Sequence, residues 1–176
     1  GDGKYEAIPV QAIGALKTQS GGKHHQRSIE LGAAIRICVL KLEEVRSKRH
    51  RHLAVEDAKA VATSCTRSQN RQLIDLAAQT LGLAGHVESS IRMFERSLKE
   101  DPNALNSRIG LLVSLSMGRR YENSLPHLRW LLNNGVKDLQ VLRLAIQSGV
   151  WGGDRSLAER AFRQLEEINP GMAPTA

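Results

Sequence analysis

Apolar residues in the middle of the chain recur every three or four positions, which is the spacing of a helix that buries one face. The clearest stretch has apolar or small side chains at i, i+3, i+4, i+7 and i+8: Leu73, Leu76, Ala77, Thr80 and Leu81. At 3.6 residues per turn these positions form one stripe that packs against a neighbouring element. The pattern therefore predicts an amphipathic helix here.

The region before this helix has similar periodicity but no fixed repeat. Six positions within 28–49 follow three-and-four spacing and predict a long helix: Leu31, Ala34, Ile35, Cys38, Leu42 and Val45. A second helix is predicted within 53–66. We interpret 27–70 as a helical pair that is either a degenerate repeat or a cap. The structure of 1–26 is left undecided, because Pro9 interrupts its periodicity.

Several residue types recur at a separation of 34 positions or twice that number. Pro102 and Pro170 lie 68 residues apart, and Gly85 and Gly153 share this offset. A small residue recurs at each step of 34: Ser90, Ser124 and Ala158. Such self-similarity indicates a repeat architecture in which each helical pair buries its faces against the next. We divide this part of the chain into three repeats, 71–104, 105–138 and 139–172.

One stretch in the first repeat carries a family resemblance. The segment from Gly85 to Asn103, GHVESSIRMFERSLKEDPN, resembles the second helix and closing Pro-Asn of the tetratricopeptide repeat family. The resemblance extends over 71–172 and implies an all-α fold, a right-handed solenoid of helical hairpins. The second repeat departs from the family pattern, since its turn glycine, Gly118, sits one place early and Val136 replaces the proline.

The resemblance also implies a partner-binding groove, formed by inward-facing positions of the first helix in each repeat. These positions are Gln72, Asp75, Gln79, Asn106, Ile109, Val113, Met117, Gln140, Arg143, Gln147 and Trp151. Gln72, Asn106 and Gln140 recur at 34-residue spacing, and such a row of amides can hydrogen-bond an extended peptide backbone. Met117 and Trp151 would add apolar anchors. The alternative is that all of these are ordinary surface residues.

The end of the last repeat is the second candidate surface. Only six residues follow Pro170, so we expect no terminal capping helix and an exposed face on the last helix. Its expected residues are Ala161, Phe162, Leu165 and Ile168. Further repeats, another domain or a second copy in a homodimer would cover this face, or it stays an exposed edge. The chain also begins without methionine, and we expect it to be a segment of a longer protein.

Charge and composition refine this picture. The net charge of +7 favours acidic partners, and the basic excess is concentrated before the repeats, in a patch of Arg46, Lys48, Arg49 and Arg51. Aromatic residues make up only 3% of the chain, which suits a core of helices packed on helices and disfavours nucleic-acid binding by base stacking. Cys38 and Cys65 are expected to be buried reduced thiols, consistent with a cytoplasmic location. No apolar run reaches the length of a membrane span.

The sequence lacks the patterns of common catalytic and cofactor sites. The pairs His24–His25 and His50–His52 have no accompanying cysteine or carboxylate cluster, so we expect a solvated basic surface and no metal. Phosphate-binding and dinucleotide-binding glycine motifs are absent from the sequence, and no cofactor is expected. We therefore expect no catalysis by this segment itself.

Three functions are compatible with these patterns. The first is a protein-interaction scaffold that binds a partner or extended peptide in the groove or through the exposed end face. The second is a helical-repeat accessory or oligomerisation domain of a larger enzyme, such as a bacterial glycosyltransferase. The third is binding of nucleic acid or another anionic surface through the basic patch, which would weaken steeply with added salt.

Overall fold

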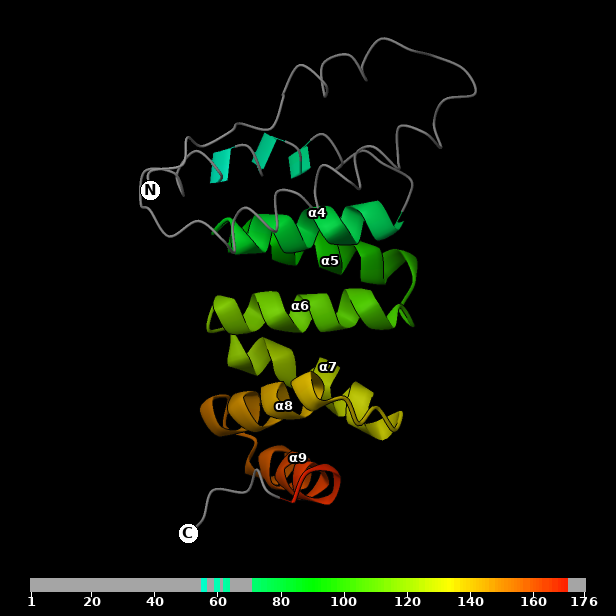
Figure 1. Cartoon of the computed structure of the whole chain (residues 1–176), viewed down its shortest axis with the longest axis vertical. Helices are drawn as coiled ribbons and strands as arrows, with labels where there is room; N and C mark the ends of the chain where they lie inside the picture. The colour runs from blue at the N-terminus through cyan, green and yellow to red at the C-terminus, as the bar shows by residue number, and fades with distance from the viewer. Residues whose placement is uncertain (1–54, 57–58, 61, 64–70, 171–176) are drawn as a thin grey trace, which may run out of the picture. The chain divides into compact units, whose positions relative to one another are not determined.

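The computed structural model describes residues 55–56, 59–60, 62–63 and 71–170 (Figure 1). All regular structure in this part of the chain is helical, which confirms the all-α prediction. The helices are α4 (Arg71–Leu83), α5 (Val87–Glu100), α6 (Leu105–Met117), α7 (Tyr121–Asn133), α8 (Leu139–Trp151) and α9 (Arg155–Ile168). The predicted helix over 28–49 and the N-terminal segment lie outside the described residues, as does most of the predicted helix over 53–66.

The helices form three hairpins with a common period. The first helices begin at Arg71, Leu105 and Leu139, so that each start lies 34 residues after the previous one. The second helices begin at Val87, Tyr121 and Arg155, again in steps of 34. The repeat seen in the sequence is therefore a repeat of helical hairpins.

The turn inside each hairpin has the same backbone hydrogen bonds. An N–H at the start of the second helix donates to a carbonyl five residues earlier: His86 to Leu81, Arg120 to Leu115, and Asp154 to Gly149. This bond is typical of a helix end that closes through one residue with positive φ. Gly85 and Gly153 take that position with φ of 90° and 80°.

Arg119 occupies the equivalent position of the second turn, with φ of 55°. The sequence pattern predicts Gly118, one place earlier, as the turn glycine of the second repeat. The structure shows that the second turn keeps the geometry of the other two by holding a non-glycine residue in the left-handed region. Such a conformation is sterically costly for a residue with a Cβ atom.

In the first of two compact units, which ends at Ser107, α4 packs on α5. The apolar stripe predicted for α4 is largely buried, as are Ile91 and Phe94 of α5 in the same unit. Asp75 adds a polar clamp: its carboxylate accepts hydrogen bonds from the hydroxyls of Ser97, at 2.9 Å, and Ser107, at 2.6 Å. Both serines are buried, so this carboxylate satisfies hydroxyl groups that have left water.

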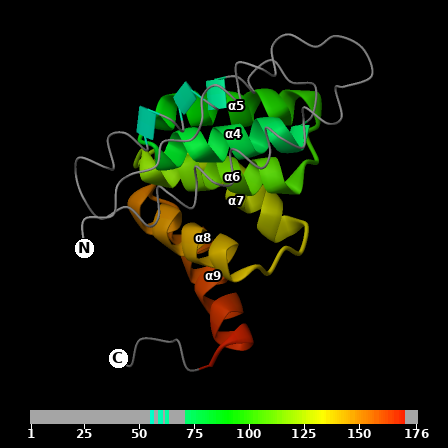
Figure 2. The ribbon, with the colours of Figure 1, turned by 45° about the horizontal axis from the view of Figure 1, so that its top comes forward.

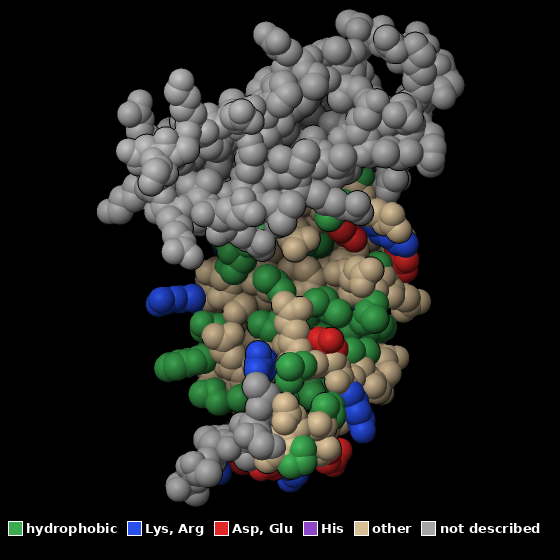
Figure 3. Space-filling view, viewed as in Figure 1, with side chains coloured by type: hydrophobic (Ala, Val, Ile, Leu, Met, Phe, Trp, Pro, Cys, Tyr) green, Lys and Arg blue, Asp and Glu red, His purple; other side chains and the backbone are tan. Residues whose placement is uncertain are grey.

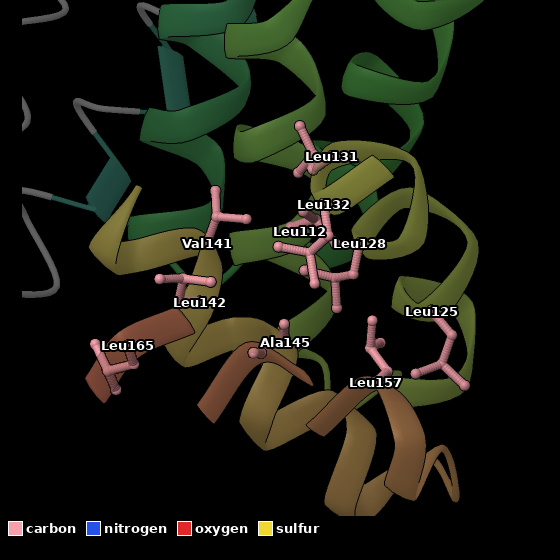
Figure 4. Packing of buried hydrophobic residues seen from close by; sticks show 11 residues of the cluster. Leu112, Leu125, Leu128, Leu131, Leu132, Val141, Leu142, Ala145, Leu157 and Leu165 are labelled. Carbon is pink, nitrogen blue, oxygen red and sulfur yellow. The ribbon is translucent and has the colours of Figure 1, made fainter. Parts of the chain in front are cut away.

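The second unit begins at Arg108, and its core joins α6, α7, α8 and α9 (Figure 4). The cluster consists of Leu112, Leu125, Leu128, Leu131, Leu132, Val141, Leu142, Ala145, Leu157, Ala161 and Leu165. Burying a leucine or valine side chain contributes about 1.5–3 kcal/mol, so α7, which supplies four leucines, contributes most to this core, and α8 and α9 supply three residues each.

α8 and α9 pack on each other as a hairpin (Figure 2). A Cβ atom at Gly149 would lie 2.8 Å from the Cβ and backbone N of Ala158 and 2.8 Å from the carbonyl O of Asp154. The missing side chain therefore lets the start of α9 approach α8. Asp154 also caps α9, since its carboxylate accepts from the backbone N–H of Leu157 at 3.0 Å.

Candidate binding surfaces

The groove residues predicted in the first unit lie on α4 and at the start of α6. Gln72, Gln79 and Asn106 are exposed, whereas Asp75 is half-buried. The Asp75 carboxylate is engaged by the two serine hydroxyls described above. Asp75 therefore holds α4, α5 and the start of α6 together.

The remaining groove residues lie in the second unit, on α6 and α8. Ile109 and Val113 are half-buried, whereas Met117 is exposed. The four residues of α8 are all exposed, and they are spaced by three, four and four positions along one line of the helix: Gln140, Arg143, Gln147 and Trp151. Trp151 has 71% of its surface exposed. We call Met117 and these four residues the α6–α8 stripe.

A hydrogen bond links the two helices that carry the stripe. The Ser116 hydroxyl on α6 donates to the side-chain oxygen of Gln147 on α8 at 2.9 Å. This bond uses the carbonyl half of the Gln147 amide, so its two N–H groups are the donors that a ligand can meet.

The first half of the stripe borders a surface hollow of about 720 Å³. The hollow is lined by Asp138, Leu139, Gln140, Arg143, Leu144 and Gln147. The Asp138 carboxylate accepts from the backbone N–H groups of Gln140, at 2.8 Å, and Val141, at 3.1 Å, and so caps α8. The lining thus combines aliphatic side chains with amide and guanidinium donors.

The predicted amide row is exposed at each of its three positions. Gln72, Asn106 and Gln140 each occupy the second residue of their helix. Their arrangement as one continuous ladder stays a prediction.

Sequence reasoning missed a cationic cluster in the second unit. Arg108 is only 8% exposed, its guanidinium carbon lies 4.0 Å from the centre of the Trp130 ring, and its Nη1 lies 3.0 Å from His127 Nδ1. Arg108 stands where the other first helices have Ile74 and Leu142, so a charge at an apolar repeat position was the available signal.

Electrostatics keep the histidine of this cluster neutral. Burial, and then the charge of Arg108, lower the pKa of His127. Burial also lowers the pKa of Arg108, which still stays charged at neutral pH. The guanidinium donates and the neutral imidazole accepts at Nδ1, which places the imidazole proton on Nε2. The cation-π contact with Trp130 stabilises the buried charge.

The structure corrects the predicted end face. Ala161 is 0% exposed and Leu165 is 8% exposed, and both belong to the core of the second unit. The prediction that they lie on the exposed face of α9 was wrong, because this side of α9 packs into that core. Phe162 is half-buried and Ile168 is exposed.

A different set of residues forms a hollow of about 670 Å³ along α8 and α9. We call it the end groove; it is lined by Ile146, Gly149, Val150, Gly153, Arg155, Ala158, Glu159, Phe162 and Arg163. Most of the lining is apolar, and Val150 has 62% of its surface exposed. The view in Figure 3 shows hydrophobic side chains reaching the surface among polar ones over the region of α6 to α9.

Several predicted features lie outside the described residues. They include the basic patch of Arg46, Lys48, Arg49 and Arg51, the paired histidines and both cysteines. Among the residues that are described, no group of three or more His, Cys, Asp or Glu side chains could hold a metal ion. In the same part of the chain, no helix is long and apolar enough to cross a membrane.

No family model, curated protein or solved structure matches this chain.

Proposed function

We propose that the three hairpins are repeats of the tetratricopeptide type and that the chain is a protein-interaction scaffold. The 34-residue steps between helix starts support the assignment, as do the repeated turns with one residue at positive φ. Ser90, Ser124 and Ala158 add further support, because all three are buried small residues at the same repeat position.

The observation that carries the function is the α6–α8 stripe. An exposed tryptophan is an effective anchor for a partner side chain, because it offers a large apolar surface that binding would remove from water. Gln140 and Gln147 offer amide groups to a peptide backbone, and Arg143 offers a planar donor to a carboxylate. The stripe fits an extended peptide with an apolar side chain for Trp151 and an acidic residue for Arg143.

A peptide-display selection on the full chain tests this proposal. Selected peptides are expected to contain acidic and apolar residues and to lose at least about tenfold in affinity when Gln140→Ala and Trp151→Ala are combined, since truncation of a central anchor typically costs 2 kcal/mol or more. The matched control combines Asn123→Ala and Ser156→Ala, two exposed helical positions outside the stripe.

Both double variants are expected to unfold at the temperature of the wild type, because none of the four side chains is buried. Peptides that bind both variants equally well, or a selection that enriches no peptide, would refute the stripe as the binding surface.

A further inference from the structure

The end groove repeats a surface that is covered elsewhere in the same unit. Thirty-four residues before Ile146 and Phe162 stand Leu112 and Leu128, which are almost completely buried. They lie in the core cluster with residues of α8 and α9, the hairpin that follows them. The helix faces that form the end groove are therefore the faces on which the array packs its next hairpin.

An ion pair lies at the edge of the equivalent surface, which stands 34 residues earlier on α6 and α7. Arg129 of α7 donates from Nε, at 2.9 Å, and Nη2, at 2.6 Å, to the carboxylate of Asp154 at the start of α9. Its equivalent in the end groove is Arg163, which is exposed and forms no ion pair among the residues that the structure describes. By analogy, an occupant of the end groove would present a carboxylate to Arg163.

The end groove has a charged residue at a position where the equivalent surface on α6 and α7 is apolar. Glu159 stands where the previous repeat has Leu125, and Arg155 donates to its carboxylate at 2.7 Å. Leu125 belongs to the same cluster as Leu157 of α9, which Figure 4 shows near it. An occupant with leucine at the corresponding position would strip water from the Glu159 carboxylate without replacing its hydrogen bonds, whereas a basic side chain would pair with it.

We propose that the end groove binds a helical hairpin of a distinct partner protein. This hairpin places an apolar ridge on Ile146 and Phe162, a carboxylate on Arg163 and a basic side chain on Glu159. The inference rests on the proposed role as an interaction scaffold, but it concerns a surface separate from the α6–α8 stripe.

The three described hairpins of a second copy do not offer this combination. The position that would face Glu159 is held in its three hairpins by Ser89, Asn123 and Leu157, none of which is basic. The position that would face Arg163 is held by His86, Arg120 and Asp154, so only the last hairpin has the carboxylate. None of the three hairpins that the structure describes combines the two charges, which favours a different protein as the occupant.

An extended chain tests the chemistry of the groove. Residues 139–170 are repeated after Met172, which keeps the 34-residue step, and the appended hairpin stands in for the partner at a high effective concentration. Two versions are compared, one unchanged and one with Leu157→Lys in the appended copy alone. Each version is made both with Glu159 and with Glu159→Leu in the original copy.

The lysine version is expected to unfold about 2–4 °C higher than the leucine version when Glu159 is present, and this order is expected to reverse with Glu159→Leu. Amide hydrogen exchange reports whether the appended hairpin is folded. The proposal would be overturned if the order of the two unfolding temperatures did not depend on residue 159, or if the appended hairpin were unprotected in all four chains. Gln140→Ala with Trp151→Ala is expected to leave the order of the unfolding temperatures unchanged. This result separates the test of the end groove from the peptide-display test of the α6–α8 stripe.

Light scattering coupled to size exclusion tests the competing occupant on the chain without an extension. A monomer over a wide concentration range supports a distinct partner. A dimer that persists on dilution and is dissociated by Phe162→Glu would show that a second copy covers the groove, and would overturn the proposal.

Discussion

Replacing Gly149 with alanine is expected to destabilise the α8–α9 hairpin, although alanine is the better helix former. The new Cβ atom would meet three atoms at 2.8 Å: the Cβ and backbone N of Ala158 and the carbonyl O of Asp154. Two of these belong to the backbone, so no side-chain rotation relieves the overlap. The start of α9 must move away from α8.

The size of the effect follows from two opposing terms. Overpacking of a tight core typically costs about 1–3 kcal/mol, and the backbone contacts place Gly149→Ala at the upper end of this range. Alanine recovers about 1 kcal/mol through helix propensity. The expected net loss is about 2 kcal/mol in the free energy of unfolding, or a decrease of about 4–8 °C in melting temperature for a chain of this size.

Urea denaturation followed by circular dichroism measures this loss. Ala158→Gly is the informative background, because it removes the Cβ–Cβ overlap and leaves both backbone contacts in place. Most of the loss in unfolding free energy caused by Gly149→Ala is therefore expected to persist in the Ala158→Gly background. Wild-type stability of Gly149→Ala, or full recovery in the Ala158→Gly background, would refute the close-approach argument.

Three further predictions concern other positions. Arg119→Gly is expected to raise the free energy of unfolding by about 1 kcal/mol in urea denaturation, because glycine adopts positive φ without steric cost; a less stable variant would contradict this. Asp75→Ala is expected to lower it by about 2–4 kcal/mol, because two buried hydroxyls lose their acceptor, while Asp75→Asn, which keeps an acceptor oxygen, should lose less in the same assay. The pKa of His127 is lowered in the folded chain, so the unfolded chain takes up this proton first and stability falls as the pH decreases below the ordinary histidine value of 6.5. His127→Gln is expected to flatten that part of a pH series of melting temperatures, and an unchanged slope would show that other groups cause it.

The helices and turns could be predicted well because their signals are local. The apolar stripe around Leu73 and the glycines at 85 and 153 each specify a backbone conformation that depends on near neighbours in the sequence. The 34-residue offsets then transfer the assignment from one hairpin to the next. Arg119 is an exception to this local prediction. Its positive φ is imposed by the hairpin around it, and an arginine in the sequence does not indicate such a conformation.

The binding surfaces were harder to predict because they depend on which side of each helix meets its neighbours. The family positions identified the exposed line on α8, yet they also included Asp75, whose role emerges only when Ser97 and Ser107 come within hydrogen-bonding distance. On α9, hydrophobicity alone did not separate Ala161 and Leu165, which face the core, from Phe162, which lines the end groove. That distinction requires the packing of α8 against α9.

The short turns also determine how this chain can reach its folded state. Each hairpin closes through three residues, so its helices meet after only a small loss of loop entropy, and contacts of this kind form quickly. The third turn combines Gly153 with the Asp154 cap. The second turn holds strained Arg119. Neither His86 in the first turn nor Arg120 in the second caps its helix through a side chain. Of the three described hairpins, α8–α9 is therefore expected to form first during folding.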